Sequence, residues 1–99
     1  MRPIHLARLD KARPVLVLTR EPVRPHLNTV TVAPITTTIR GLSTEVPLGT
    51  KNGVEEQCVV TCDHITTIPV AALGPQIGRL LDHQETTLTG AIRAAFDLD

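Results

Sequence analysis

The segment that most constrains the fold is residues 13–38, which hold two runs rich in β-branched residues. The first run is Val15–Thr19, and the second is Asn28–Ala33, which leads to three consecutive threonines at 36–38. Such runs favour β-strands, and the prolines lie only at their margins, where no ladder hydrogen bond is lost. The charged, proline-rich stretch between them, Glu21–Leu27, predicts a short loop.

Antiparallel pairing of these two strands would bring Arg13 and Thr36 together. Arg13 stands just before the first strand, and Thr36 follows the second. In an antiparallel pair, the start of one strand lies beside the end of the other. We therefore expect a guanidinium group and a hydroxyl group to meet at one edge of the sheet.

A further strand is predicted ahead of this pair, at Pro3–Leu9, and residues 10–12 join it to the pair. A connection of three residues allows only a hairpin. The turn would therefore carry Asp10 and Lys11 to the edge that holds Arg13.

The rest of the chain predicts more short strands and a closing helix. Dense or alternating apolar residues mark strands at Leu42–Leu48, Cys58–Cys62, Ile65–Ile68 and Leu73–Leu81, with a helical turn at Pro69–Ala72. The final helix would be capped by Asp82 with Glu85 three residues on, and its apolar stripe consists of Leu88, Ala91, Ile92, Ala95 and Phe96. This pattern predicts one mainly-β domain over residues 1–99, a small, strongly bent antiparallel sheet or barrel with a C-terminal helix.

Composition narrows the function classes. No apolar run approaches the ~20 residues of a membrane span, and the N-terminus lacks the apolar core of a signal peptide, so we expect a cytoplasmic protein without a membrane partner. Phe96 is the only aromatic residue, which argues against a nucleic-acid site built on aromatic stacking.

The zero net charge hides a strong asymmetry along the chain. Residues 1–40 hold seven basic and two acidic side chains, a balance of +5, whereas residues 41–99 hold three basic and eight acidic ones, a balance of −5. Either the arginines are simply solvated, or one face attracts phosphates. In the second case, six basic side chains would crowd one edge of the sheet: Arg2, Arg8, Lys11, Arg13, Arg20 and Arg24.

Neither the cysteines nor the histidines predict a metal site. On a strand, Cys58 and Cys62 would lie about 13 Å apart at ~3.3 Å per residue, too far for a disulfide, so we expect two reduced, half-buried thiols. A zinc site with Cys62 and His64 would need two more ligands, and no second cluster offers them. Histidines can act as acid and base on RNA, but no two are close in sequence; His64, beside Asp63, is the best placed to contact a substrate.

Four segments together resemble the PemK/MazF family of toxin endoribonucleases. They are residues 13–18 (RPVLVL), 32–37 (VAPITT), 63–68 (DHITTI) and 73–80 (LGPQIGRL), and their order and spacing extend over nearly the whole chain. The resemblance implies a small SH3-like barrel with a C-terminal helix that acts as a homodimer. It also implies cleavage of single-stranded messenger, ribosomal or transfer RNA without a metal or other cofactor, blocked by a cognate MazE-like antitoxin. From the charge division, we expect that antitoxin to use an acidic, initially disordered segment.

The resemblance also implies roles for particular residues. The family's catalytic arginine falls on Arg13 and its threonine on Thr36, with charge stabilisation and phosphate binding as their roles. The family's longer acidic loop is absent here, so Asp10 is the candidate to replace its acid, either orienting Arg13 or accepting the proton of the 2′-hydroxyl. Five further residues are candidates for RNA contact: Lys11, Thr37, Arg20, Asp63 and His64.

Two other functions are compatible with the same fold. The barrel is shared by gyrase poisons, which act by binding a protein, and a related barrel could bind RNA or protein without cutting. The pairing of Arg13 with Thr36 and the basic N-terminal half favour RNA cleavage over both.

Overall fold

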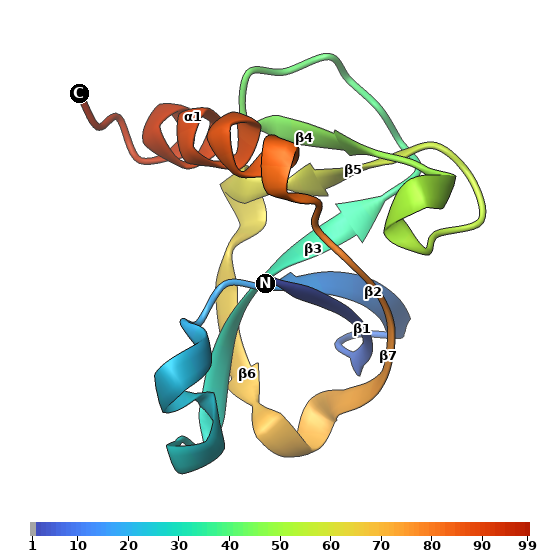
Figure 1. Cartoon of the computed structure of the whole chain (residues 1–99), viewed down its shortest axis with the longest axis vertical. Helices are drawn as coiled ribbons and strands as arrows, with labels where there is room; N and C mark the ends of the chain where they lie inside the picture. Colours follow the sequence, from blue (N-terminus) through green and yellow to red (C-terminus); the bar gives the residue numbers. More distant parts are fainter. Residues whose placement is uncertain (1) are drawn as a thin grey trace.

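The computed structural model describes residues 2–99, which form a bent antiparallel sheet and one α-helix (Figure 1). The helix, α1, spans Glu85–Ala95. The strands are β1 (Pro3–Arg8), β2 (Ala12–Val17), β3 (Thr29–Thr36), β4 (Glu45–Leu48), β5 (Cys58–Thr61), β6 (Thr66–Pro69) and β7 (Leu73–Arg79). Their order in the sheet is β4-β5-β3-β2-β1-β7, and β6 pairs with β3 away from this path. The predicted mainly-β class with a C-terminal helix is confirmed.

The long strand β3 links the two halves of the molecule. Its first half pairs with β6, from Thr29 opposite Pro69 to Val32 opposite Thr66, and its last two residues pair with β5. In Figure 1, β3 accordingly runs from the lower half, beside β6, to the upper half, beside β5. Its β-branched residues suit this position, because both faces of the strand are covered by apolar side chains.

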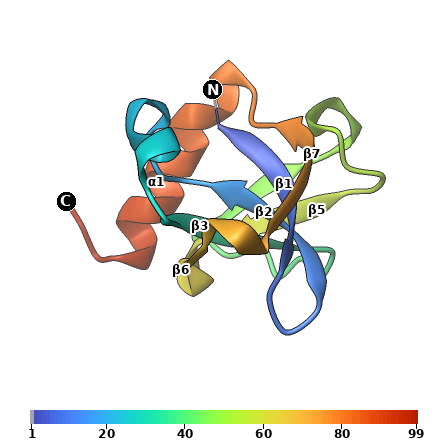
Figure 2. The ribbon, with the colours of Figure 1, turned by 90° about the horizontal axis from the view of Figure 1, so that it is seen from below.

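Alternate residues of β2 and β3 point into two separate apolar cores. The upper core lies beneath α1 and contains Ile4, Leu16, Ala33, Ile35, Val46, Leu48, Cys58, Val60, Cys62, Leu80, Leu88 and Ala91. The lower core contains Ala7, Val15, Val17, Val30, Val32 and Ile68. Figure 2 views the molecule from below and shows β1, β2, β3, β6 and β7 curving around the half that lies lower in Figure 1. The period-two alternation of strands explains why neighbours such as Val15 and Leu16 serve different cores.

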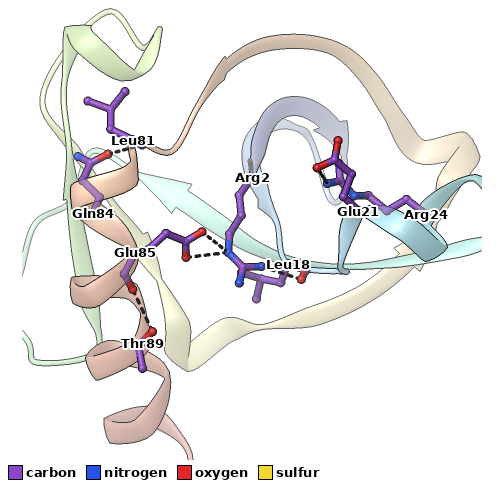
Figure 3. Close-up of polar contacts among 8 residues, drawn as sticks. All are labelled: Arg2, Leu18, Glu21, Arg24, Leu81, Gln84, Glu85 and Thr89. Atoms are coloured by element: carbon purple, nitrogen blue, oxygen red, sulfur yellow. Dashed lines mark hydrogen bonds and ion pairs between the residues drawn. The ribbon is translucent and has the colours of Figure 1, made fainter.

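Arg2, directly before β1, links this strand to the start of α1. Its Nε atom donates to both carboxylate oxygens of Glu85 at 3.0 and 3.1 Å, and its guanidinium also donates to the carbonyl of Leu18 at 2.9 Å (Figure 3). Glu85 therefore forms an ion pair with Arg2.

The helix start differs from the prediction that Asp82 caps it. Asp82 lies in a short 3-10 turn, Asp82–Gln84, that precedes the helix. The side-chain oxygen of Gln84 accepts the N–H of Leu81 at 2.9 Å, so Gln84 closes this turn (Figure 3). At the other end, Phe96 follows the last helical residue and is 55% exposed, so it does not extend the apolar stripe.

Three other segments differ in type or extent from the elements expected for them. The stretch Glu21–Leu27 was expected to be a loop, but Glu21–His26 forms a 3-10 helix with Pro22 in its first turn, a position that suits the fixed backbone angle of proline. The strand expected over Leu42–Leu48 contains only Glu45–Leu48, and Leu42 is 46% exposed. The predicted turn at Pro69–Ala72 is a 3-10 turn over Val70–Ala72.

Within residues 2–99, no helix is long and apolar enough to cross a membrane.

Candidate active site

The pairing of β2 with β3 places Arg13 and Thr36 at one edge of the sheet. The two strands are antiparallel with Val15 opposite Pro34, and continuing this register by two residues sets Arg13 opposite Thr36. Both side chains are half-buried, and both line two adjoining pockets. The structure therefore places this cation and this hydroxyl at the same end of the β2–β3 pair, in the lining of the same two pockets.

Asp10 lies on the β1–β2 hairpin, next to this pair. Its Oδ1 accepts the Nε–H of Arg13 at 3.3 Å and the backbone N–H of Lys11 at 2.9 Å. Desolvation acts against the charged form, but the Arg13 charge and these hydrogen bonds outweigh it and lower the pKa of Asp10 below its ordinary value. Asp10 is therefore a carboxylate at neutral pH, and it restricts the orientation of the Arg13 guanidinium.

The hydroxyl group of Thr36 is held by the backbone that follows it. Its oxygen accepts the N–H of Thr38 at 3.1 Å. A hydroxyl that accepts one hydrogen bond can still donate its own hydrogen. Thr36 can therefore donate to an anionic oxygen in the pockets that it lines.

The larger pocket has a volume of about 650 Å³ and an apolar floor. We call it the apolar pocket. Lys11 and Thr37, two of the candidates for RNA contact, line it together with Arg13 and Thr36. Glu55 and Glu56, which were not among the candidate site residues, also line it and are exposed. The floor consists of Leu6, Pro14, Ile35, Val54, Cys58 and Ile77.

The smaller pocket has a volume of about 310 Å³ and is lined mainly by polar side chains. We call it the polar pocket. It contains the predicted residues Asp63 and His64, and the hydroxyl of Thr44 donates to Asp63 at 2.6 Å. It also contains Arg40, which the sequence analysis did not select. Nothing in the local sequence showed which way the side chain of Arg40 would face.

Some basic residues lie away from this edge. Arg20 lines a different groove, with Val23 and Leu27 of the segment after β2, so it is not brought to the site. Arg2 is paired with Glu85, and Arg24 lies 3.9 Å from the carboxylate of Glu21 (Figure 3). The prediction that six basic side chains crowd one edge is therefore wrong for these three arginines, because β2 carries its two ends to opposite sides of the molecule.

The two cysteines are free thiols and are both buried, more deeply than the expected half-burial. Burial raises the pKa of Cys58, and burial together with the nearby Asp63 raises the pKa of Cys62 to about 11. Among residues 2–99, no three His, Cys, Asp or Glu side chains are grouped in a way that could hold a metal ion.

Comparison with known proteins decides the family. The pattern of the family described as "PemK-like, MazF-like toxin of type II toxin-antitoxin system" matches residues 4–96. The chain belongs to this family. The resemblance seen in the four sequence segments is thereby confirmed.

Members of the PemK/MazF family include close relatives of this chain. Endoribonuclease MazF3 of Mycobacterium tuberculosis is 67% identical over 99 residues, which are all of this chain and 96% of that relative. The solved structure of the Mycobacterium tuberculosis toxin MazF-mt6 superimposes with a TM-score of 0.97 at 66% identity and covers 99% of both chains. A mycobacterial endoribonuclease in complex with its cognate antitoxin has a TM-score of 0.87 at 23% identity, covering 98% of this chain and 93% of its own, and so shares the fold.

Proposed function

We propose that this protein is the toxin of a type II toxin–antitoxin system and that it cleaves single-stranded RNA with Arg13 and Thr36. The observation that carries this proposal is the position of both side chains where the two pockets meet, with Asp10 bound to Arg13. A close relative named as an endoribonuclease supports the activity. Translation of messenger RNA would then stop when the toxin is not bound by its antitoxin.

The reaction we propose uses the RNA as its own nucleophile. A ribose 2′-hydroxyl attacks the adjacent phosphorus, the bond to the 5′-oxygen of the next nucleotide breaks, and the products carry a 2′,3′-cyclic phosphate and a 5′-hydroxyl. Negative charge grows on the phosphoryl oxygens in the transition state. Arg13 binds those oxygens as a permanently charged, forked donor, and Thr36 donates its hydroxyl hydrogen to one of them.

Asp10 has two possible roles in this scheme, and its contacts favour one of them. Its lowered pKa makes it a weak base for the 2′-hydroxyl proton, whereas its bond to the Arg13 Nε atom suits an orienting role. We therefore assign Asp10 to the positioning of Arg13. The proton that leaves the 2′-hydroxyl passes to solvent, and the leaving 5′-oxygen takes a proton from water.

Cleavage in the presence of EDTA tests this function directly. Purified protein is incubated with total RNA and EDTA, and the new 5′ ends are mapped and tested for a 5′-hydroxyl. We expect recurrent ends at one short sequence in single-stranded regions. Activity that disappears in EDTA and returns with magnesium, on RNA that is unfolded in both conditions, would contradict metal-independent cleavage. No new ends under either condition would favour a gyrase poison or a non-catalytic binding module.

We also propose a homodimer in the cytoplasm, inhibited by an antitoxin with an acidic segment. Fold relatives solved with antitoxins support the type of partner. Lys11 and Arg13 line the apolar pocket, and an acidic peptide placed there would exclude RNA phosphates. Exposed ion pairs contribute only ~0–1 kcal/mol each, so charge should act mainly on the association rate. If the neighbouring-gene product binds while RNA stays bound, and its on-rate does not change with salt, this part of the proposal is wrong.

A further inference from the structure

We propose that the polar pocket holds the nucleotide next to the scissile phosphate, and that Arg40 binds the phosphodiester on that side. The inference deepens the proposed function and rests on it, since it names how the same site holds its substrate. It adds to Arg13 and Thr36 a second phosphate-binding residue, located on the connection between β3 and β4.

The first observation is that the two pockets share residues. Arg13, Thr36 and Thr38 line both the apolar pocket and the polar pocket. An RNA strand whose scissile phosphate lies against Arg13 and Thr36 therefore has one pocket for the chain before the cleaved bond and the other for the chain after it. Arg40 belongs only to the polar pocket. It is thus placed to meet a neighbouring phosphate and not the one that reacts.

The second observation is that, in the part of the chain that the structure describes, no protein carboxylate holds the guanidinium of Arg40. Its side chain is exposed and, within residues 2–99, its guanidinium has no ion-pair partner. Glu45 and Asp63 also line the polar pocket, but their hydrogen bonds go to backbone N–H groups and to the Thr44 hydroxyl, not to Arg40. A forked cation without a protein partner, beside the catalytic pair, suits a phosphodiester oxygen.

The third observation is that the backbone of Arg40 is held in place. The carboxylate of Glu45 accepts the N–H of Arg40 at 3.2 and 3.3 Å, of Gly41 at 2.8 Å and of Leu42 at 3.1 Å. Gly41 adopts a left-handed backbone with φ +74°, a conformation that favours glycine. The turn is therefore organised before RNA arrives, which lowers the entropy that binding must remove.

The test compares Arg40→Ala with Arg93→Ala, a matched control that removes an exposed arginine from α1. Both substitutions keep the backbone N–H, so the bonds to Glu45 survive in Arg40→Ala. The probe is a short single-stranded RNA that spans a mapped cleavage site and carries a 2′-deoxy sugar at the attacking position, so that it binds without being cut. We expect Arg40→Ala to weaken binding roughly tenfold. It should also reduce the slope of log affinity against log salt by about 0.7, whereas Arg93→Ala changes neither quantity.

A neutral methylphosphonate in place of single phosphates then locates the contact. At one phosphate flanking the cleaved bond, the replacement should weaken binding to the unmutated protein by a similar factor and have no further effect on Arg40→Ala. Additive effects at both flanking phosphates would overturn the inference, as would binding of Arg40→Ala equal to that of the control. A loss that is unaffected by every methylphosphonate would instead indicate contact with a base and would also overturn it.

The two proposals fail in different ways. If the unmutated protein makes no new RNA ends, the proposed cleavage is wrong, and binding of a random-sequence RNA still tests Arg40. If cleavage occurs but Arg40→Ala and Arg93→Ala behave alike, only the role of Arg40 is wrong. If the unmutated protein binds no RNA at all, both proposals are wrong.

Discussion

The Nε atom of Arg13 lies 3.3 Å from the Oδ1 atom of Asp10, so the β1–β2 hairpin carries its own acid to the arginine that we propose as catalytic. The two residues are three apart in sequence, and the hairpin register of Ala7 opposite Arg13 brings the turn back toward β2.

The first prediction follows from that ion pair. Removing the guanidinium in Arg13→Ala should raise the pKa of Asp10 from its lowered value toward or above 3.8, its ordinary value. Because the pKa of the folded state is depressed, the stabilising effect of the pair is complete above the unfolded value and is lost as the pH falls through the folded one. Carbon-detected NMR titration of the Asp10 carboxyl measures the shift. The same midpoint in both proteins would contradict the pairing.

The second prediction concerns the catalytic pair. Arg13→Ala and Thr36→Ala should each lower the cleavage rate by a factor on the order of 10² or more, as loss of a transition-state donor does. Both residues lie at the sheet edge and are only half-buried, so the fold should persist. Cleavage of the mapped RNA is measured beside circular dichroism, with Arg93→Ala as the control. A folded variant that cuts at a near-normal rate removes that residue from the catalytic pair.

The third prediction concerns the carboxylate that organises the β3–β4 connection. Glu45→Ala removes the acceptor of three backbone N–H groups, so the amides of Arg40, Gly41 and Leu42 should exchange faster with solvent. Hydrogen-exchange mass spectrometry measures this, and Glu56→Ala is the control, since that exposed acid holds no such turn. Equal exchange of residues 40–42 in the two variants would show that Glu45 does not hold this turn.

The fourth prediction contrasts two glycines. A methyl group at Gly78 would overlap the carbonyl oxygen of Asn52 and lie 2.8 Å from its carbonyl carbon, whereas one at Gly90 meets nothing within 4 Å. Gly78→Ala should therefore lower the free energy of unfolding by about 2 kcal/mol or more. Gly90→Ala should raise it by ~0.5–1 kcal/mol, because Gly90 lies inside α1. Urea unfolding measures both, and the prediction is rejected if the two variants shift the midpoint in the same direction.

The fifth prediction concerns the buried thiols. The raised pKa of Cys58 and the pKa of about 11 of Cys62 keep both protonated at neutral pH, and burial blocks access. Neither should react with a thiol reagent in the folded protein, and both should react in urea. Because these pKa values are raised, stability should fall as the pH rises above the ordinary value of 9.0. Rapid labelling of either thiol in the folded protein would be inconsistent with this burial.

Much of the fold and the centre of the site could be predicted because both depend on local patterns. The β-branched runs predicted β2 and β3, and a three-residue turn predicted the β1–β2 hairpin. Antiparallel pairing then brought Arg13 opposite Thr36 without further information, since the register follows from two strands that are close in sequence. Asp10 followed from the same hairpin.

Side-chain hydrogen bonds within the loops and contacts between distant segments decided the rest. Alternation predicted a strand from Leu42, but the carboxylate of Glu45 binds the backbone N–H groups of residues 40–42 and turns this stretch into a loop that places Arg40 in the polar pocket. Arg20 lies at the other end of β2 from Arg13, so charge counted along the chain could not say which arginines share an edge. The close approach of Gly78 to Asn52 likewise joins segments that no local pattern relates.

The sequence by itself therefore determined which strands form and which side chains their nearest pairings bring together. Only the tertiary structure decided where the loops and the remaining charges lie, because their positions depend on particular side-chain hydrogen bonds and on packing with partners far along the chain.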